Sequence, residues 1–515
     1  MKILNPRWAI ILNIFFSVLG LVLNIVINLV LTPYITNNLG VEAYGYIGLA
    51  NNVVGYIEII SVALNSLAAR YVALEYHKMD YRQANKYYNS VIVANLFLSF
   101  IILVPMCIFI FYLDNLIKIP LNMVLDVKIL FLLVVINYTL MLLSNCFNIA
   151  TFIKNRLDIT AFLKNISYLI KALALVIIFS LFIPSVWMVS VAIIISSLFL
   201  LISNIYLTKK LTPNLAINPK KSSVTAVKEL VSNGSWNSIS SLGVTLNSGL
   251  DLLVTNIFIN ATAMGQLSVV KSITFIFNTF VSVFTQAFRP IQLEAYSKND
   301  QQGMINEFNL SMKVTGYICS VTFAGLFALG YSFLEFWIPG QDTKTIYKVL
   351  IIVLVGDVMG AVSYPLNYVF TIINKLKVPS MISILNGILN LILILLLLQM
   401  TGLGLYAVVL TTAFLNIVVQ LIIIPILACY YLKLSYFTFY PVILKSVLNC
   451  FALSIIFMFV SKLYIQIDSW FGLIVWIIVL GGGGTIISLF ILFSSQERTK
   501  ILGILLKKSK GKKST

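Results

Sequence analysis

The sequence predicts an all-α polytopic membrane protein, with about fourteen transmembrane helices in two pseudo-symmetric six-helix lobes plus two C-terminal helices. Three observations carry this prediction. Of the 515 residues, 60% are hydrophobic and 10% are charged, and the mean hydropathy is +0.99. Apolar runs long enough to cross a bilayer, which takes about 20 helical residues, recur along the whole chain. A pattern in the first run returns near residue 240, which indicates an internal duplication.

The apolar runs and the polar or helix-breaking residues between them define the predicted spans. The first run follows Lys2 and Arg7 as a signal peptide would. It is too long for one and lacks a small-residue cleavage site, so we interpret it as a retained span. The predicted spans are 8–31, 44–66, 89–112, 128–152, 159–181, 185–208, 229–257, 265–288, 308–330, 345–372, 379–400, 403–428, 441–465 and 469–493.

Basic residues alternate between the two sets of connections. Lysine and arginine near span ends stay on the cytoplasmic side of a membrane. One set carries Arg70, Lys78, Arg82, Lys86, Lys154, Arg156, Lys209, Lys210, Lys220, Lys221, Lys228, Arg289, Lys298, Lys375, Lys377, Lys433, Lys445 and a lysine-rich tail. The other set carries Lys118, Lys128, Lys344, Lys348 and Lys462. Both termini are therefore expected to be cytoplasmic.

The same topology accounts for most of the net charge of +18. No nucleic-acid partner is expected, because the basic residues are spread over the inner connections and do not form one basic face. The tail LLKKSKGKKST either contacts anionic membrane lipids or is simply solvated.

The duplication is clearest in the first and seventh spans. SVLGLVLNIVINLVLT, residues 17–32, matches SSLGVTLNSGLDLLVT, residues 240–255, with Asp251 in place of Asn28. The segment from Arg70 to Glu75 is echoed from Arg289 to Glu294. Each copy then holds six spans and the two copies share one orientation. The predicted organisation is an N-lobe 1–208, a basic cytoplasmic linker 209–228, a C-lobe 229–429, two helices in 441–493 and a basic tail 494–515.

Polar residues recur on one face of several predicted spans. Offsets of three, four and seven residues place Ser17, Gly20, Asn24, Asn28 and Thr32 on one stripe. Small residues and carboxamides are typical of helix packing in membranes. An ionisable residue at a helix centre costs roughly 2.5–3.5 kcal/mol on insertion scales, so those present must face water, substrate or one another.

Two sets of candidate site residues follow from this argument. The candidate substrate-cavity residues are Asn24, Asn28, Arg70, Lys164, Lys171, Asn247, Lys271, Asn278 and Arg289. The candidates for coupling to a proton or sodium ion are Glu58, Asp251 and Asp357. Arg70 and Arg289 also fit the role of inner anchors, and Lys164 is close enough to the inner end of its span to reach the interface.

One contact is predicted from spacing alone. Asp251 and Lys271 are equally far from the turn near Ala261, so they lie at similar depth on antiparallel helices. We expect a salt bridge between them, whose counterparts in the first copy are the neutral Asn28 and Asn52. It is either a static pair that joins two helices or a switch used in transport.

The sequence lacks the motifs of nucleotide-binding, metal and catalytic sites. GGGG at 481–484 lies in an apolar span, and GKKST at the tail lacks the upstream glycine of a phosphate loop. There is one histidine, His77, and the five cysteines form no close pair. We therefore expect no ATPase, no cofactor, no metal site and no enzymatic activity. Short external connections also argue against a membrane polysaccharide polymerase or ligase, the alternative from a different class.

The amino-terminal region resembles a known family. ITNNLGVEAYGYIGL, with Leu39-Gly40, Glu42 and Tyr44-Gly45, followed by Arg70, is similar to the signature of polysaccharide transporters, the Wzx-type O-antigen and capsule flippases of the multidrug/oligosaccharidyl-lipid/polysaccharide exporter superfamily. The close match covers the first ninety residues or so, and the six-plus-six-plus-two plan extends it over the chain.

The resemblance implies a function in lipopolysaccharide or capsule biosynthesis. Such a protein moves an undecaprenyl-diphosphate-linked oligosaccharide across a bacterial or archaeal cytoplasmic membrane by alternating access, with both lobes rocking about a central cavity. A coupling ion and contacts with the polysaccharide assembly machinery belong to the same expectation. A lipid II flippase and a multidrug cation exporter of the same superfamily are the alternatives, and the basic candidate residues argue against the exporter.

Overall fold

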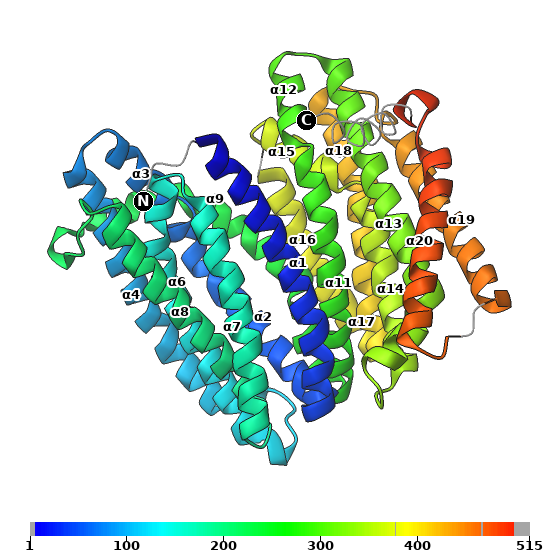
Figure 1. The fold of residues 1–515 in the computed structure, drawn as a ribbon, viewed down its shortest axis with the longest axis horizontal. Coiled ribbons are helices and arrows are strands. Elements are labelled where there is room, and N and C mark those ends of the chain that lie inside the picture. The colour runs from blue at the N-terminus through cyan, green and yellow to red at the C-terminus, as the bar shows by residue number, and fades with distance from the viewer. Residues whose placement is uncertain (1–5, 376, 465–466, 499–515) are drawn as a thin grey trace, which may run out of the picture. The chain divides into compact units, whose positions relative to one another are not determined.

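The computed structural model describes residues 6–375, 377–464 and 467–498, and these ranges are almost entirely helical (Figure 1). The α-helices are α1 (Pro6–Leu39), α2 (Val41–Asn65), α3 (Ala68–His77), α4 (Tyr81–Phe111), α5 (Leu113–Leu116), α6 (Val124–Ile153), α7 (Leu157–Leu181), α8 (Met188–Leu211), α9 (Val224–Ser248), α10 (Leu250–Phe258), α11 (Ala261–Ala287), α12 (Arg289–Ser297), α13 (Gln301–Trp337), α14 (Thr343–Ala361), α15 (Asn367–Ile372), α16 (Lys377–Met400), α17 (Leu405–Val418), α18 (Ile424–Leu432), α19 (Tyr440–Tyr464) and α20 (Trp470–Leu492). A π-helical turn, Val419–Ile423, joins α17 to α18. Strands are absent from the described ranges, so the predicted all-α class is confirmed.

Twelve of the described helical segments are long and apolar enough to cross a membrane, and a bent pair raises the number to thirteen. The bent pair is Thr343–Ala361 with Tyr364–Ile372, which meet at 50°. Large apolar side chains stand exposed on these segments, for example Phe471 at 77% and Phe490 at 68% on α20. Such surfaces suit contact with lipid and not with water.

The predicted seventh span, 229–257, differs from the other thirteen. It is occupied by α9 and α10, which are separated at Gly249. α10 is too short to span a membrane, and α9 is too rich in serine and asparagine to count as an apolar segment. The span predicted at 229–257 and the total of fourteen spans therefore stay predictions.

The chain divides into two compact units, residues 1–272 with 383–391 and residues 273–382 with 392–515. In the first unit α6 packs on α8, α2 on α9, α1 on α7, and α4 on both α3 and α6 (Figure 1). In the second unit α13 packs on α14, α19 and α20, and α14 packs on α17. The division falls within α11, whereas the sequence suggests a boundary in the linker 209–228. The predicted lobes stay a prediction.

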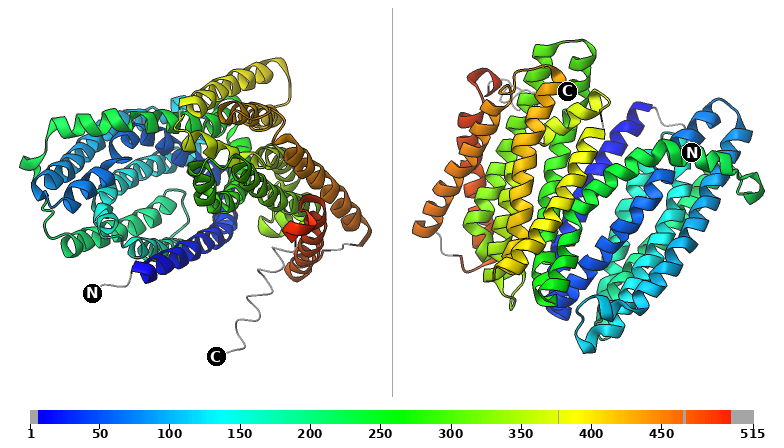
Figure 2. Two further views of the ribbon diagram at one scale, coloured as in Figure 1. Left: turned by 90° about the horizontal axis from the view of Figure 1, so that it is seen from above. Right: turned by 180° about the vertical axis from the view of Figure 1, so that it is seen from behind.

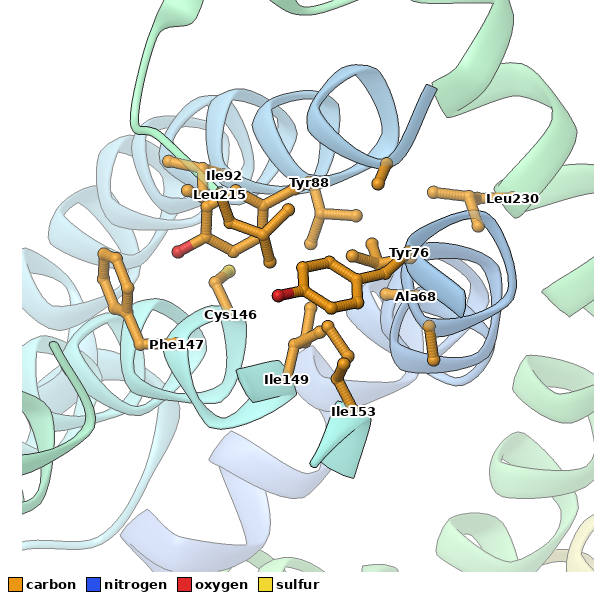
Figure 3. Close-up of a cluster of buried hydrophobic side chains, with 14 of the residues drawn as sticks. Ala68, Tyr76, Tyr88, Ile92, Cys146, Phe147, Ile149, Ile153, Leu215 and Leu230 are labelled. Carbon is orange, nitrogen blue, oxygen red and sulfur yellow. The ribbon is translucent and has the colours of Figure 1, made fainter. Parts of the chain in front are cut away.

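A buried apolar cluster joins the ends of several helices of the first unit near α3. Figure 3 shows Tyr76 of α3, Tyr88 of α4 and Cys146 of α6 packed around one centre. Leu215 of the linker and Leu230 of α9 complete the same cluster. The linker and α9 are therefore part of the core of this unit.

Side chains of α4 hold the linker in place. Asn85 donates to the carbonyl of Asn214 at 2.7 Å and accepts from the N–H of Ala216 at 2.9 Å. Asn89 donates to the carbonyl of Ala216 at 3.0 Å and accepts from the N–H of Asn218 at 2.7 Å. Each carboxamide thus supplies the backbone partners that a strand would otherwise provide.

The same turn ends five of the helices. Its central residue has a positive φ and is Met79, Asn155, Asn299, Asn374 or Lys433. In every case the next N–H bonds to the carbonyl five residues earlier, at 2.8–3.1 Å, as in a Schellman motif. The five turns fall on five of the connections predicted to be cytoplasmic, a side that remains a prediction.

Two of these turns extend the sequence duplication into local structure. After Met79, Asp80 caps α4 by accepting from the N–H of Gln83 at 2.9 Å. After Asn299, Asp300 caps α13 by accepting from the N–H of Gly303 at 2.8 Å. The two copies therefore share the same turn and the same N-cap after their second span.

Candidate functional site

The structure confirms the predicted contact between Asp251 and Lys271. The Nζ of Lys271 on α11 lies 3.0 Å from Oδ2 of Asp251 on α10. The Asp251 side chain is 7% exposed and that of Lys271 is 25% exposed. Removal of one partner from a pair this shielded is destabilising, because the remaining charge loses its counter-charge at 3.0 Å while staying largely out of water.

The backbone next to this ion pair is held by α2. The carbonyl of Gly249, at the break between α9 and α10, accepts from Nδ2 of Asn52 at 3.0 Å and from the hydroxyl of Tyr56 at 2.6 Å. Figure 2 shows α9, in green, along the blue α2 on the rear face. The sequence identifies Asn52 only as the neutral counterpart of Lys271 in the first copy. Tyr56 gave no signal in the sequence.

A second polar group lies within the other compact unit, around Asp357 of α14. Asn278 of α11 donates to Oδ2 of Asp357 at 2.9 Å. Asn416 of α17 lies 3.5 Å from Oδ1 of Asp357 and donates to the carbonyl of Gly356 at 3.1 Å. The side-chain oxygen of Asn278 is buried and has no hydrogen-bond partner. Two amide nitrogens therefore face the carboxylate, and the side-chain oxygens of Asp357 and Asn278 are of the ligand type that hard cations prefer.

Asn278 was predicted to line the substrate cavity, yet it contacts a predicted coupling residue. Asn416 was missed. Its signal was a carboxamide within the apolar run 403–428. Close by, Gln420 of the π-helical turn accepts from Nδ2 of Asn367 at 3.2 Å. π-Helical turns within α-helices often mark functional sites.

The two asparagines of α1 form a local pair. Nδ2 of Asn28 donates to Oδ1 of Asn24 at 2.7 Å and to its carbonyl at 2.9 Å. Both side chains are half-buried, and the opposite face of α1 exposes Val22, Val26 and Val30 at 50–59%. α1 therefore turns its apolar stripe outward and its carboxamides toward the protein, as the sequence predicts.

Lys171 is half-buried in the middle of α7. Two contacts show which residues of α1 lie beside which residues of α7. Asn165 donates to the carbonyl of Phe16 at 2.9 Å, and the rings of Tyr34 and Phe179 stack with centroids 5.6 Å apart. The two helices are parallel, and Lys171 falls at the level of the carboxamide pair of α1. Among the described residues its ammonium has no hydrogen-bond or ion-pair partner.

The remaining predicted residues are not brought together. Glu58 of α2, Arg70 of α3 and Lys164 of α7 are exposed, and none has a polar partner among the described side chains. Arg289, at the start of α12, stacks its guanidinium on the ring of Tyr368 at 5.2 Å, which suits the anchor role. Asn247 lies on α9, and its side chain falls outside the described part of the chain.

A surface pocket of about 550 Å³ lies beside the connection between α4 and α6. Residues 114–120 line it together with Ile257 and Ala261. Asn256 of α10 anchors this connection, since it accepts from the N–H of Lys118 at 2.8 Å and donates to its carbonyl at 3.1 Å. α10 therefore contacts neighbours at both of its ends.

The fold is shared with solved transporters. The lipid II flippase MurJ in an inward closed conformation aligns with a TM-score of 0.68 at 16% identity, over 93% of this chain and 98% of that one. A multidrug resistance MATE family transporter of the MOP superfamily, in an inward-facing conformation, aligns with a TM-score of 0.67 at 13% identity, over 82% of this chain and 98% of that one. These likenesses establish the fold.

The sequence also matches a bacterial membrane protein and a protein family. The uncharacterized membrane protein EpsK of Bacillus subtilis (strain 168) is 28% identical over 477 residues, which cover 92% of this chain and 93% of EpsK. Residues 10–295, more than half of the chain, match the family described as "Polysaccharide biosynthesis protein". The chain is therefore a multi-pass membrane protein with a fold like that of MurJ and the MATE transporter, and it belongs to the polysaccharide biosynthesis protein family.

Proposed function

We propose that this protein is a flippase. It translocates undecaprenyl-diphosphate-linked oligosaccharide repeat units across the cytoplasmic membrane by alternating access, for the synthesis of a surface polysaccharide such as O-antigen or capsule. The protein acts as a transporter and not as an enzyme. The observation that carries the proposal is the family match over residues 10–295 on a fold shared with a lipid flippase.

The unpartnered lysine of α7 supports an anionic substrate. Lys171 sits at the level of Asn24 and Asn28, so one charge and two carboxamides lie at a common depth in the first unit. A partly desolvated ammonium attracts a diphosphate more strongly than one in water does. The carboxamides can exchange their mutual hydrogen bonds for sugar hydroxyls.

The polar group around Asp357 supports a coupling cation. A sodium ion is held by carboxylate, carboxamide and carbonyl oxygens, and a proton by the carboxylate alone. The unsatisfied side-chain oxygen of Asn278 is an available ligand beside the carboxylate. Asp251 serves a different purpose in this proposal, as the partner that Lys271 leaves and regains in each cycle.

The test is the fate of lipid-linked intermediates after clean deletion of the gene. We expect undecaprenyl-linked repeat units to accumulate on the cytoplasmic face, where a membrane-impermeant glycosidase acts only in inverted vesicles. Surface polysaccharide should be lost and restored by the intact gene. Unchanged surface polysaccharide without a substituting flippase would refute the proposal.

A lipid II flippase is the second candidate, favoured by the alignment with MurJ over nearly the whole of both chains. The same deletion strain separates the two. Accumulation of lipid II with normal repeat-unit export would select the second candidate.

A further inference from the structure

The clearest irregularity near the Asp251–Lys271 pair is the break between α9 and α10. The N–H of Gly249 still bonds to the carbonyl of Thr245 at 2.8 Å, so α9 ends regularly. The carbonyl of Gly249 accepts from two side chains of α2, Asn52 and Tyr56. In a membrane protein, backbone groups at a helix break are stable only when neighbouring helices supply partners.

The break requires a glycine. A Cβ at Gly249 would lie 2.7 Å from the carbonyl oxygen of Thr245 and 3.0 Å from Cε1 of Tyr56. The ring of Tyr56 therefore packs directly against the backbone at the break. Its hydroxyl and the Asn52 carboxamide fix the direction in which that backbone points.

The duplication shows that the break and the charge occur together. In the first copy the position of Gly249 is taken by Val26, which is 50% exposed on the continuous helix α1. The position of Asp251 is taken by Asn28, whose amide is satisfied within its own helix. The second copy instead has a helix break, a carboxylate and a partner on another helix.

The residues that hold the segment 249–251 are themselves repeat-related. Asn52 of α2 and Lys271 of α11 occupy the same position in the two copies. Asn52 binds the carbonyl of Gly249 and Lys271 binds the carboxylate of Asp251. Residues of α2 and α11 thus hold the two ends of the segment 249–251.

We propose that Asn52 and Tyr56 are positioning residues for the ion pair. They hold the start of α10 so that Asp251 reaches Lys271, and their release together with the ion pair lets α9 change its angle to α10. The inference rests on the proposed function only for its assignment of this movement to transport. The clasp itself is defined by the two hydrogen bonds to Gly249.

Thiol labelling on α9 tests the clasp without any transport assay. Ser240 is exposed on α9 and carries the probe as Ser240→Cys, in a background with Cys107→Ser. Cys107 is exposed, and the other four native cysteines are buried, so their labelling reports unfolding. Asn52→Leu and Tyr56→Phe should each change the maleimide labelling rate at position 240 by about threefold or more. Tyr56→Phe removes only the hydroxyl and preserves packing.

The matched control is Ser238→Ala. Ser238 donates to the carbonyl of Ile59 at 2.8 Å, so it makes a similar bond on the same α2–α9 interface, away from the break. We expect no change in labelling for this control. An equal change would show that any loosening of the interface has the effect, and would overturn the proposal.

A double-mutant cycle adds a result that a merely structural role would not give. In the neutral background Asp251→Asn with Lys271→Gln, Asn52→Leu should have little further effect on labelling, because the ion pair it positions is gone. Fully additive effects would overturn the proposal. If labelling does not change while the deletion test supports the flippase, the positioning role of Asn52 and Tyr56 is refuted and the proposed function stands. If the deletion test fails while labelling changes as expected, the proposed function is refuted and the positioning role stands.

Discussion

Asp251 is an acidic residue that its sequence context explains only in part. Its spacing from the turn near Ala261 predicts a partner at equal depth, and the 3.0 Å contact with Lys271 confirms that prediction. The clasp on Gly249 was not predictable, because it depends on which way α2 is rotated about its axis. Sequence spacing predicts the depth of a side chain in the membrane. The rotation of its helix, which decides the neighbour that the side chain faces, is seen only in the structure.

The ion pair gives a test that separates a static role from a switch. Asp251→Asn should destabilise the folded protein by about 3–5 kcal/mol, because it removes the carboxylate that lies 3.0 Å from the half-buried ammonium of Lys271. The neutral double variant Asp251→Asn with Lys271→Gln should recover most of this stability, measured as thermal unfolding in detergent. We expect its repeat-unit export to stay lost. Recovery of export with stability would mean that the pair is static.

Lys171 offers a prediction about substrate charge. Lys171→Met should reduce export of repeat units at least about tenfold, since one contact with a diphosphate contributes on the order of 1.5–3 kcal/mol. Stability should change little or improve, because the ammonium lacks a polar partner among the described residues. Lys210→Met, at the exposed end of α8, is the control. Equal export by both variants would argue against substrate contact at Lys171.

The group around Asp357 predicts a dependence on one cation. Asp357→Asn should abolish the stimulation of export by sodium, or by a proton gradient, while the membrane level of the protein is unchanged. Asn278→Ala should weaken the same dependence, since it removes a neighbouring oxygen and the amide that orients the carboxylate. Vesicles with imposed ion gradients provide the measurement. Full stimulation in Asp357→Asn would exclude this site.

At the scale of elements, apolar runs predict most helices because lipid admits few other structures. The exception is α9, where serines and asparagines replace the apolar residues of a span. Its polar side chains bond to the C-terminal end of α2 and to α3: Asn237 donates to the C-cap residue Ser66 at 3.1 Å, and Asn233 donates to Tyr71 of α3 at 2.8 Å. The duplication predicted a helix there correctly. The break at Gly249 was missed, because a single glycine does not distinguish a tight packing contact from an interruption.

The segment after α20 is bonded to α13. Glu497 accepts from Nζ of Lys313 at 2.8 and 2.9 Å and from the N–H of Ser494 at 2.8 Å. Burial alone would raise the pKa of Glu497, but these bonds hold that pKa below its ordinary value. The contact is thus complete above a pH of about 4.5 and is lost as the pH falls through the lowered pKa of the folded state.

We therefore expect Glu497→Gln to speed tryptic cleavage after Arg498 several-fold at neutral pH, measured by mass spectrometry of the released tail. Glu294→Gln is the control, because Glu294 pairs with Lys298 on an exposed helix end. Equal cleavage rates in parent and Glu497→Gln would show that the contact does not restrain this segment.

For the whole molecule, the basic connections predict one orientation in the membrane. Met79, in one of the five left-handed turns, should lie on the cytoplasmic side, and Leu121, 95% exposed before α6, on the outer side. In a background with Cys107→Ser, an impermeant thiol reagent should label Leu121→Cys in intact cells and Met79→Cys only in inverted vesicles. The reverse pattern would invert the proposed topology and place both termini outside.

The packing of α9 on α2 has a consequence for how the protein is made. Ribosomes synthesise about 5–20 residues per second and early segments fold first. α2 leaves the ribosome long before α9. Nearly two hundred residues are synthesised after Tyr56 and Asn52 before the carbonyl of Gly249, which accepts their hydrogen bonds, is present. Until then another protein in the membrane, such as an insertase, must shield the polar face of α2 from lipid. A chain that stalls within the linker would expose that face and mark itself for proteolysis.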